Sequence, residues 1–311
     1  MAFAKRSFFA KRQHRLPGRV ALSITHERVG LVLAGRGSGF AAERASGSDA
    51  GASLAALVRE AGATGMSAEW LLDPGQYHLL QVEKPAVPAA EWVQALRWKA
   101  RDLLPYPIED AVLDAFEVPG LDSRGRPPSL YLAAARKDEL RPRIAEIAAA
   151  GLVLEAIGIA DLAWAAVAHQ VIPGDDSLAV LMLDPRGGSM LALREQRLFV
   201  SRRFEFDSDD QRALRDPQDE RNERLFERVA LELQRTLDYF DRNHQRPPPR
   251  RLLLASGIDG AEGLDAALRR LLGIDVQRLD ATARWPSLAA QPTAAGHRLA
   301  PLAAIASGSA A

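Results

Sequence analysis

The order of three strands, a helix and a further strand occurs twice along the chain, and this repetition constrains the fold more than any other feature. In the first occurrence, apolar residues alternate along 20–24, return along 29–34 and continue weakly along 39–45. A predicted helix around 54–61 and a strand at 70–72 follow. Because alternation with a period of two points one side of each strand toward a core, these residues predict a sheet covered by a helix.

The second occurrence starts near residue 178. Three predicted strands span 178–204, with a turn at Asp184, and a long amphipathic helix around 226–240 follows them. A strand, a helix and a last strand over 252–279 complete this half. The two halves therefore predict one topology used twice.

A segment with a different order of predicted strands and helices separates the halves. Residues 76–150 read as a strand, a helix over 89–103, two strands joined by a polar turn, and a helix that ends at Gly151. We expect this segment to be a small subdomain inserted in the first lobe. The expected parts of the chain are a basic tail (1–19), a first lobe (20–172) that contains the insertion (about 76–150), a second lobe (173–290) and a C-terminal helix that returns to the first lobe (291–311).

Composition excludes several classes of function. The 311 residues include no cysteine, so disulfides, thiolate zinc sites and cysteine nucleophiles are excluded, and the 6 histidines are too scattered to predict a metal site. The 40 Lys and Arg residues balance 40 Asp and Glu residues, which argues against a nucleic-acid partner. No apolar stretch predicts a membrane span or a secretory signal, so we expect a cytoplasmic protein.

The N-terminal tail combines basic and aromatic residues without any acid. Such a segment can lie on an anionic membrane surface, and a solubilising tail is the alternative interpretation. The candidate membrane-surface residues are Lys5, Arg6, Phe8, Phe9, Lys11 and Arg12.

The duplicated order, with an acidic or glycine-containing turn after the first strand of each half, resembles the layout of the actin-like ATPase superfamily. That resemblance implies an α/β fold of the actin-like, ribonuclease H-like kind, duplicated in two lobes. In that superfamily two turns grip the nucleotide phosphates through their backbone amides, and a glycine pair holds adenosine.

Four stretches resemble one branch of this superfamily more closely. They are ALRWKARDLLPYPIEDAVLDAF, YLAAARKDEL, LELQRTLDYF and SGIDGAEGLDAALRRLLGIDV. These stretches are similar to the PilM-like cytoplasmic proteins of type IV pilus assembly, and within them to the MshI proteins of the mannose-sensitive haemagglutinin (MSHA) pilus. The resemblance implies a cytoplasmic scaffold that lies peripherally at the inner membrane.

The residues that would act on phosphate depart from the family pattern. An Asp-x-Gly turn follows the first strand in competent members, and Ser23 and Thr25 stand at those positions here. The second turn keeps Asp184 but carries Pro185 and Arg186 where the family has an apolar residue and glycine. Because phosphoryl transfer depends on placed charge and metal, the resemblance implies a pseudo-ATPase.

Weak nucleotide binding stays open, with Mg-ATP bound weakly or no cofactor at all. For Glu232 and Arg235 the preferred interpretation is an ordinary solvated helix face. The candidate contacts, all degenerate relative to the family, are Ser23, Thr25, Asp184, Gly187, Gly188, Ser189, Glu232, Arg235, Gly257 and Gly260.

The resemblance also implies a partner. In the family, a groove beside the inserted subdomain receives the cytoplasmic N-terminal tail of a PilN-like inner-membrane protein, which is disordered until it binds. For Trp98 core packing is the preferred interpretation, since tryptophan is highly buried on average. The candidate partner-binding residues are Trp98, Leu104, Pro105, Tyr106 and Ile108.

Two alternatives remain beside the scaffold. One is an active actin-like ATPase whose nucleotide state regulates partner binding, with Asp184 organising the metal. The other is a membrane-surface adaptor tethered by the basic tail.

Overall fold

The computed structural model describes residues 19–35, 39–118, 128–174, 177–214, 216, 220–244, 247–258 and 261–308. The candidate membrane-surface residues Lys5, Arg6, Phe8, Phe9, Lys11 and Arg12, and the candidate nucleotide contact Gly260, lie outside these residues. The chain divides into two compact units between Ala163 and Trp164, and Ile305–Gly308 are grouped with the first unit.

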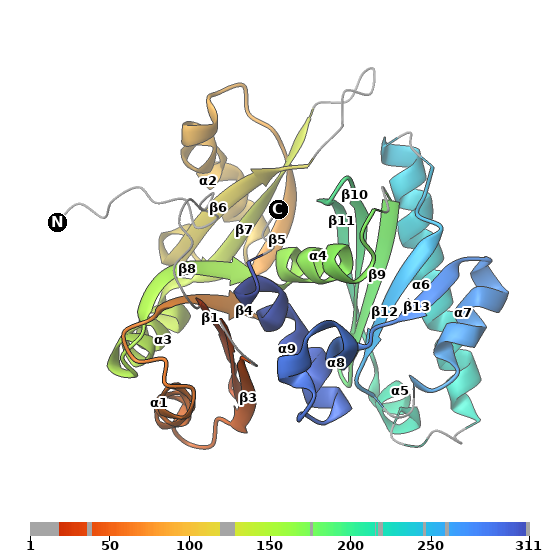
Figure 1. The fold of residues 1–311 in the computed structure, drawn as a ribbon. Helices are drawn as coiled ribbons and strands as arrows, with labels where there is room; N and C mark the ends of the chain where they lie inside the picture. Colours follow the sequence, from red (N-terminus) through yellow and green to blue (C-terminus); the bar gives the residue numbers. More distant parts are fainter. Residues whose placement is uncertain are drawn as a thin grey trace. The chain divides into compact units, whose positions relative to one another are not determined.

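The first unit contains a five-stranded sheet with the order β3-β2-β1-β4-β8, of which Figure 1 labels β1, β3, β4 and β8. β1 pairs antiparallel with β2 and parallel with β4, and β4 pairs parallel with β8. The strands are β1 (Arg19–Ile24), β2 (Arg28–Ala34), β3 (Phe40–Ala45), β4 (Ser67–Leu72) and β8 (Val153–Ile159).

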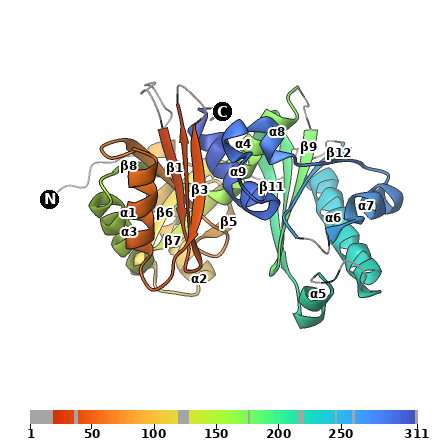
Figure 2. The ribbon, with the colours of Figure 1, turned by 60° about the horizontal axis from the view of Figure 1, so that its bottom comes forward.

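Two helices of this unit, α1 (Ala50–Glu60) and α3 (Lys137–Ala149), pack against each other beside the sheet (Figure 2). α1 begins after Asp49, whose Oδ1 accepts the N–H of Ala52 at 2.9 Å and so caps the helix. The buried residues of α1 recur at three- and four-residue steps, as expected for a helix with one face on a core.

The insertion forms a three-stranded antiparallel sheet with the order β5-β7-β6. α2 covers one face of this sheet, and Leu96 and Ala100 of the helix pack with Leu113 and Leu132 of the strands. The elements are β5 (His78–Glu83), η1 (Ala89–Glu91), α2 (Trp92–Leu103), η2 (Ile108–Asp110), β6 (Ala111–Glu117) and β7 (Ser129–Arg136).

The second unit repeats the sheet of the first. Its order is β11-β10-β9-β12-β13, with the same sequence of antiparallel and parallel pairs. The predicted mixed α/β topology used twice is therefore confirmed. The strands are β9 (Ser177–Asp184), β10 (Gly187–Arg194), β11 (Arg197–Glu205), β12 (Arg251–Ser256) and β13 (Asp275–Arg278).

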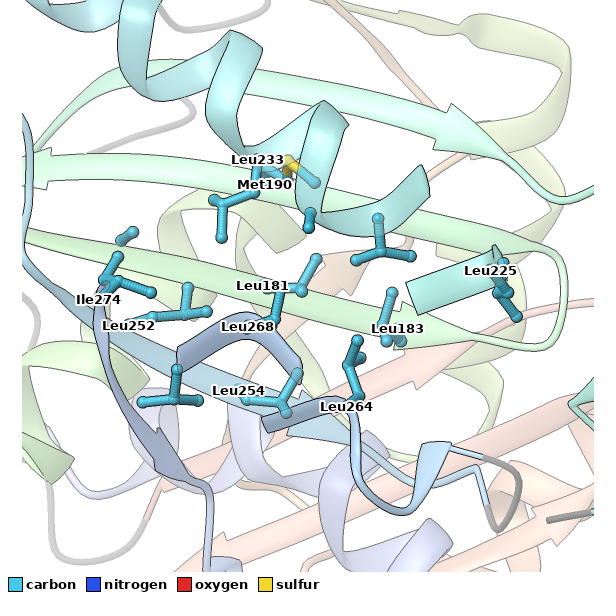
Figure 3. Packing of buried hydrophobic residues seen from close by; sticks show 14 of the residues in the cluster. Leu181, Leu183, Met190, Leu225, Leu233, Leu252, Leu254, Leu264, Leu268 and Ile274 are labelled. Atoms are coloured by element: carbon cyan, nitrogen blue, oxygen red, sulfur yellow. The ribbon is translucent and has the colours of Figure 1, made fainter. Parts of the chain in front are cut away.

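Apolar side chains join one face of this second sheet to α6 (Arg221–His244) and α7 (Leu264–Leu272). Figure 3 shows Leu181, Leu254 and Leu268 in the middle of this cluster, with Leu233 of α6 above the strands. The short helix α5 (Ser208–Ala213) packs on α6.

Gln170 links the remaining helices. Its side-chain amide donates to the backbone oxygen of Ala304 at 3.0 Å, and its own backbone oxygen accepts from Arg284 at 3.0 Å. The helices that Gln170 links are α4 (Ala160–Val171), α8 (Ala281–Arg284) and α9 (Thr293–Ala306), and the short η4 (Pro286–Leu288) lies between α8 and α9 along the chain. α4 is one continuous helix, although the division between the compact units falls inside it.

The described part of the chain contains no helix that is both long and apolar enough to cross a membrane. It also contains no group of three or more His, Asp or Glu side chains arranged to hold a metal ion.

Candidate functional site

The side chain of Thr25 closes the turn after β1. Its Oγ1 accepts hydrogen bonds from the N–H groups of Glu27 (3.3 Å) and Arg28 (2.9 Å), and it donates to the backbone oxygen of Arg28 (3.1 Å). Ser23 lies inside β1, opposite Gly30 of β2 and Leu71 of β4. Both residues thus build the hairpin, and neither supplies a carboxylate that could position metal-bound water.

Asp184 closes the corresponding turn of the second unit. Its Oδ1 accepts the N–H of Arg186 at 2.6 Å and the N–H of Gly187 at 3.1 Å, as in an Asx turn. At least one carboxylate oxygen of Asp184 is therefore engaged in local structure.

The two glycines after this turn are explained by close packing. A Cβ on Gly187 would stand 2.2 Å from the backbone oxygen of Phe204, and one on Gly188 would stand 2.3 Å from the Phe204 ring. Ser189 follows in β10, opposite Met182 and Arg203. The backbone of β11 leaves no room for a Cβ at Gly187, and the Phe204 ring would have to move to admit one at Gly188, whether or not a phosphate ever lies there.

The other described nucleotide candidates also have local partners. Glu232 and Arg235 of α6 form an ion pair with each other, with 2.7 Å between Oε1 and Nη1. A Cβ on Gly257, just after β12, would stand 2.8 Å from the Cα of Ala294 in α9. Turns, strand pairing and packing within each unit therefore account for these residues, and their assignment to a nucleotide stays a prediction.

Trp98 lies on the solvent side of α2. Its exposed fraction is 61%, whereas Leu96 is 1% exposed. The interpretation of Trp98 as a core residue is therefore wrong. Each helical residue advances about 100°, so Trp98 lies about 200° around the helix from Leu96 and faces away from the sheet.

The side chains of the aromatic-proline turn after α2 point alternately toward the core and toward solvent. Leu104, Tyr106 and Ile108 are buried in the core of the insertion, while Pro105 is exposed. The Arg136 guanidinium lies 5.2 Å from the centroid of the Tyr106 ring, and burial raises the pKa of the Tyr106 hydroxyl. The buried residues anchor the turn, so of the five partner candidates only Trp98 and Pro105 are exposed.

A small apolar cavity lies on the opposite face of the insertion sheet, toward β8. It encloses about 30 Å³, more than the roughly 10–15 Å³ needed to admit a water-sized group. Its walls come from β4, β6, β7, β8, α3 and the segment before β5. The lining residues are Leu72, Tyr77, Val112, Leu113, Asp114, Ala133, Ala134, Ala135, Leu140, Ile157 and Ile159.

The alternation of β7 explains why this face is hollow. Ala134 packs with the core under α2, so Ala133 and Ala135 point to the other face of the sheet. Because an alanine side chain ends at Cβ, both positions leave space that larger residues would fill. Sequence reasoning missed this cavity, and the run of alanines in YLAAARKDEL is the signal that could have indicated it.

No protein-family model matches the chain. Among solved structures, the chain is similar to a chain of the PilM-PilN type IV pilus biogenesis complex, with 21% sequence identity, a TM-score of 0.67 and coverage of 93% of this chain and 96% of that one. It is also similar to a Bacteroides thetaiotaomicron protein with an actin-like ATPase fold and unknown function, at 7% identity, a TM-score of 0.53 and coverage of 87% and 95%. The predicted actin-like ATPase fold is thereby confirmed.

Proposed function

We propose that the chain is a non-catalytic scaffold of a type IV pilus assembly platform, which binds the cytoplasmic tail of a PilN-like inner-membrane protein. The observation that carries this proposal is the shared fold with the PilM-PilN complex over nearly the whole chain. The four stretches that resemble PilM-like and MshI proteins support a role in an MSHA-type system. The protein would then lie in the cytoplasm, peripheral to the inner membrane.

The two turns support a scaffold rather than an ATPase. Thr25 stands where a competent member has glycine, and its hydroxyl is engaged in the hairpin. Asp184 is retained, but its Oδ1 is held by the N–H groups of Arg186 and Gly187. Since catalysis of phosphoryl transfer needs carboxylates free to hold magnesium and water, the remaining groups favour a pseudo-ATPase.

We place the partner site at the apolar cavity between the insertion sheet and β8. A tail that is disordered when free must order on binding, so a preformed site that takes one anchor side chain lowers the cost of association. The cavity of about 30 Å³ accepts a small group, and its walls are almost entirely apolar. A short aliphatic side chain of an extended peptide meets both conditions.

A binding titration with the N-terminal cytoplasmic tail of the PilN-like partner tests the proposal. We expect saturable binding without nucleotide, and we expect Ala133→Leu to weaken it by at least about tenfold because the new side chain fills the cavity. Ala148→Leu, on the exposed face of α3, is the matched control and leaves the affinity unchanged. Equal binding of a scrambled tail, or a strict requirement for Mg-ATP, contradicts the proposal.

A further inference from the structure

Tyr77 lines the cavity described above and also contacts the first turn of α4. It is 2% exposed, and it directly precedes β5 of the insertion. Its hydroxyl forms a hydrogen bond with Asp161, which lies outside the insertion, 84 residues away in the sequence.

The contact with Asp161 is reciprocal. The Tyr77 hydroxyl donates a hydrogen bond to Oδ2 of Asp161, and it accepts one from the Asp161 N–H at 3.3 Å. That N–H belongs to the first turn of α4, where backbone donors have no partner inside the helix. Tyr77 therefore caps the start of α4 with its hydroxyl.

The burial of Asp161 makes this contact costly to break. Asp161 is 3% exposed, and a buried carboxylate that loses a hydrogen-bond donor costs much more than an exposed one. When the Tyr77 ring moves, Asp161 must either follow or lose that donor. The first turn of α4 is thus coupled to the position of the ring.

The chain enters α4 directly from the cavity wall. Ile157 and Ile159 of β8 line the cavity, and α4 starts at Ala160. The helix then continues past Ala163 into the residues of the second compact unit.

The geometry points to Tyr77 as a positioning residue that transmits occupancy of the cavity to the first turn of α4, the occupant being a short aliphatic side chain of an extended peptide. The identity of this occupant rests on the proposed function. Protein interiors are close-packed, so a group that enters a cavity of about 30 Å³ presses on its walls, and the Tyr77 ring is one of them. The hydroxyl carries that displacement to Asp161.

The first arm of the test needs no partner. Ala133→Leu fills the cavity from within, and amide hydrogen exchange is followed by mass spectrometry over residues 157–171. We expect the exchange rate in the first turn of α4 to change by at least about fivefold, and the change to disappear in a Tyr77→Phe background. Ala135→Val replaces Ala133→Leu if that variant fails to fold.

The second arm adds the tail peptide to the wild-type chain and to Tyr77→Phe. With peptide at a concentration that saturates each chain in its own titration, we expect the wild-type chain to show the change in α4 exchange and Tyr77→Phe to lose it. Tyr131→Phe, which removes the hydroxyl of another buried tyrosine of the insertion that does not line the cavity, is the matched control and keeps the response.

The outcomes separate the two proposals. A first-arm response without any peptide binding contradicts the proposed function and leaves the relay standing. Peptide binding with no change in α4, or with the same change in Tyr77→Phe, overturns the relay and leaves the proposed function standing. An α4 that does not respond in the first arm overturns the relay whatever the peptide does.

Discussion

The backbone oxygen of Phe204 lies 2.2 Å from the point where a Cβ on Gly187 would stand. At the neighbouring Gly188 the obstacle is the ring of Phe204, at 2.3 Å, which can turn. The same strand thus restricts two adjacent glycines, one by rigid backbone and the other by a movable side chain.

Alanine at these glycines should therefore destabilise the second unit unequally. We expect Gly187→Ala to lower the free energy of unfolding by about 1–3 kcal/mol, and Gly188→Ala to lower it by less, because overpacking against backbone is harder to relieve. Urea denaturation of both variants measures the difference. A larger loss for Gly188→Ala would show that the ring is the stiffer neighbour.

The two faces of α2 should respond differently to truncation. Leu96→Ala removes a fully buried side chain and is expected to lower the free energy of unfolding by about 2–5 kcal/mol. Trp98→Ala should change it by less than about 0.5 kcal/mol, since this ring faces solvent. A large loss of stability from Trp98→Ala would place the ring in a core and reverse the assignment of the helix faces.

Mg-ATP should not stabilise the protein. A ligand present at about 100 times its Kd raises the free energy of unfolding by about 2.7 kcal/mol, so an unchanged denaturation midpoint at millimolar Mg-ATP excludes micromolar binding. Isothermal titration gives an independent measurement. Micromolar affinity that disappears in Asp184→Ala would instead favour the active ATPase.

His244 predicts a dependence of stability on pH. The residue is 2% exposed, both ring nitrogens lack hydrogen-bond partners among the described residues, and burial lowers its pKa below the ordinary 6.5. The folded state therefore binds the proton less readily than the unfolded state. Stability is highest above pH 6.5 and falls as the pH drops from 6.5 toward the folded pKa, by at most about 1.4 kcal/mol per pH unit.

His244→Phe isolates this effect from His297, whose pKa burial also lowers. The substituted ring keeps its aromatic neighbours Phe199 and Phe240 and has no nitrogen to protonate. We expect the stability gained by His244→Phe to be larger at pH 5.5 than at pH 7.5, measured by urea denaturation. A gain that does not vary with pH would show that His244 stays neutral in both states or titrates equally in both.

Residues 1–18 of the basic tail, whose last residue Arg19 begins β1, should carry any affinity for anionic membranes. Their basic and aromatic side chains predict that the full chain floats with vesicles rich in anionic lipid at low salt and sinks at high salt. The chain without these residues should remain in the soluble fraction. Flotation unaffected by the deletion would exclude the tail as the tether.

The periodicity of the sequence predicts the duplicated sheets because strand alternation and helical repeats are local properties. The expectation that Trp98 is buried rests on its residue type alone. Its exposure is decided instead by its position around α2 relative to Leu96 and Ala100, which face the core. The cavity could not be predicted for a different reason. It depends on how β7 lies across from β8, and strand alternation alone does not determine a contact between two sheets.

The same limit applies to the glycines after Asp184. In the sequence they fit a phosphate turn, and their packing role becomes visible only when Phe204 is placed opposite them. Conversely, the sequence alone shows that the first turn lacks the family's carboxylate, because Ser23 and Thr25 carry no charge in any fold.

The hollow face of β7 depends on two methyl groups, those of Ala133 and Ala135, and the α2 core on the opposite face does not include them. With the partner site placed at this cavity as we propose, ligand choice and the packing of the α2 core depend on different residues of one strand. A change in the size of either methyl would therefore alter the cavity while leaving the residues of the α2 core as they are.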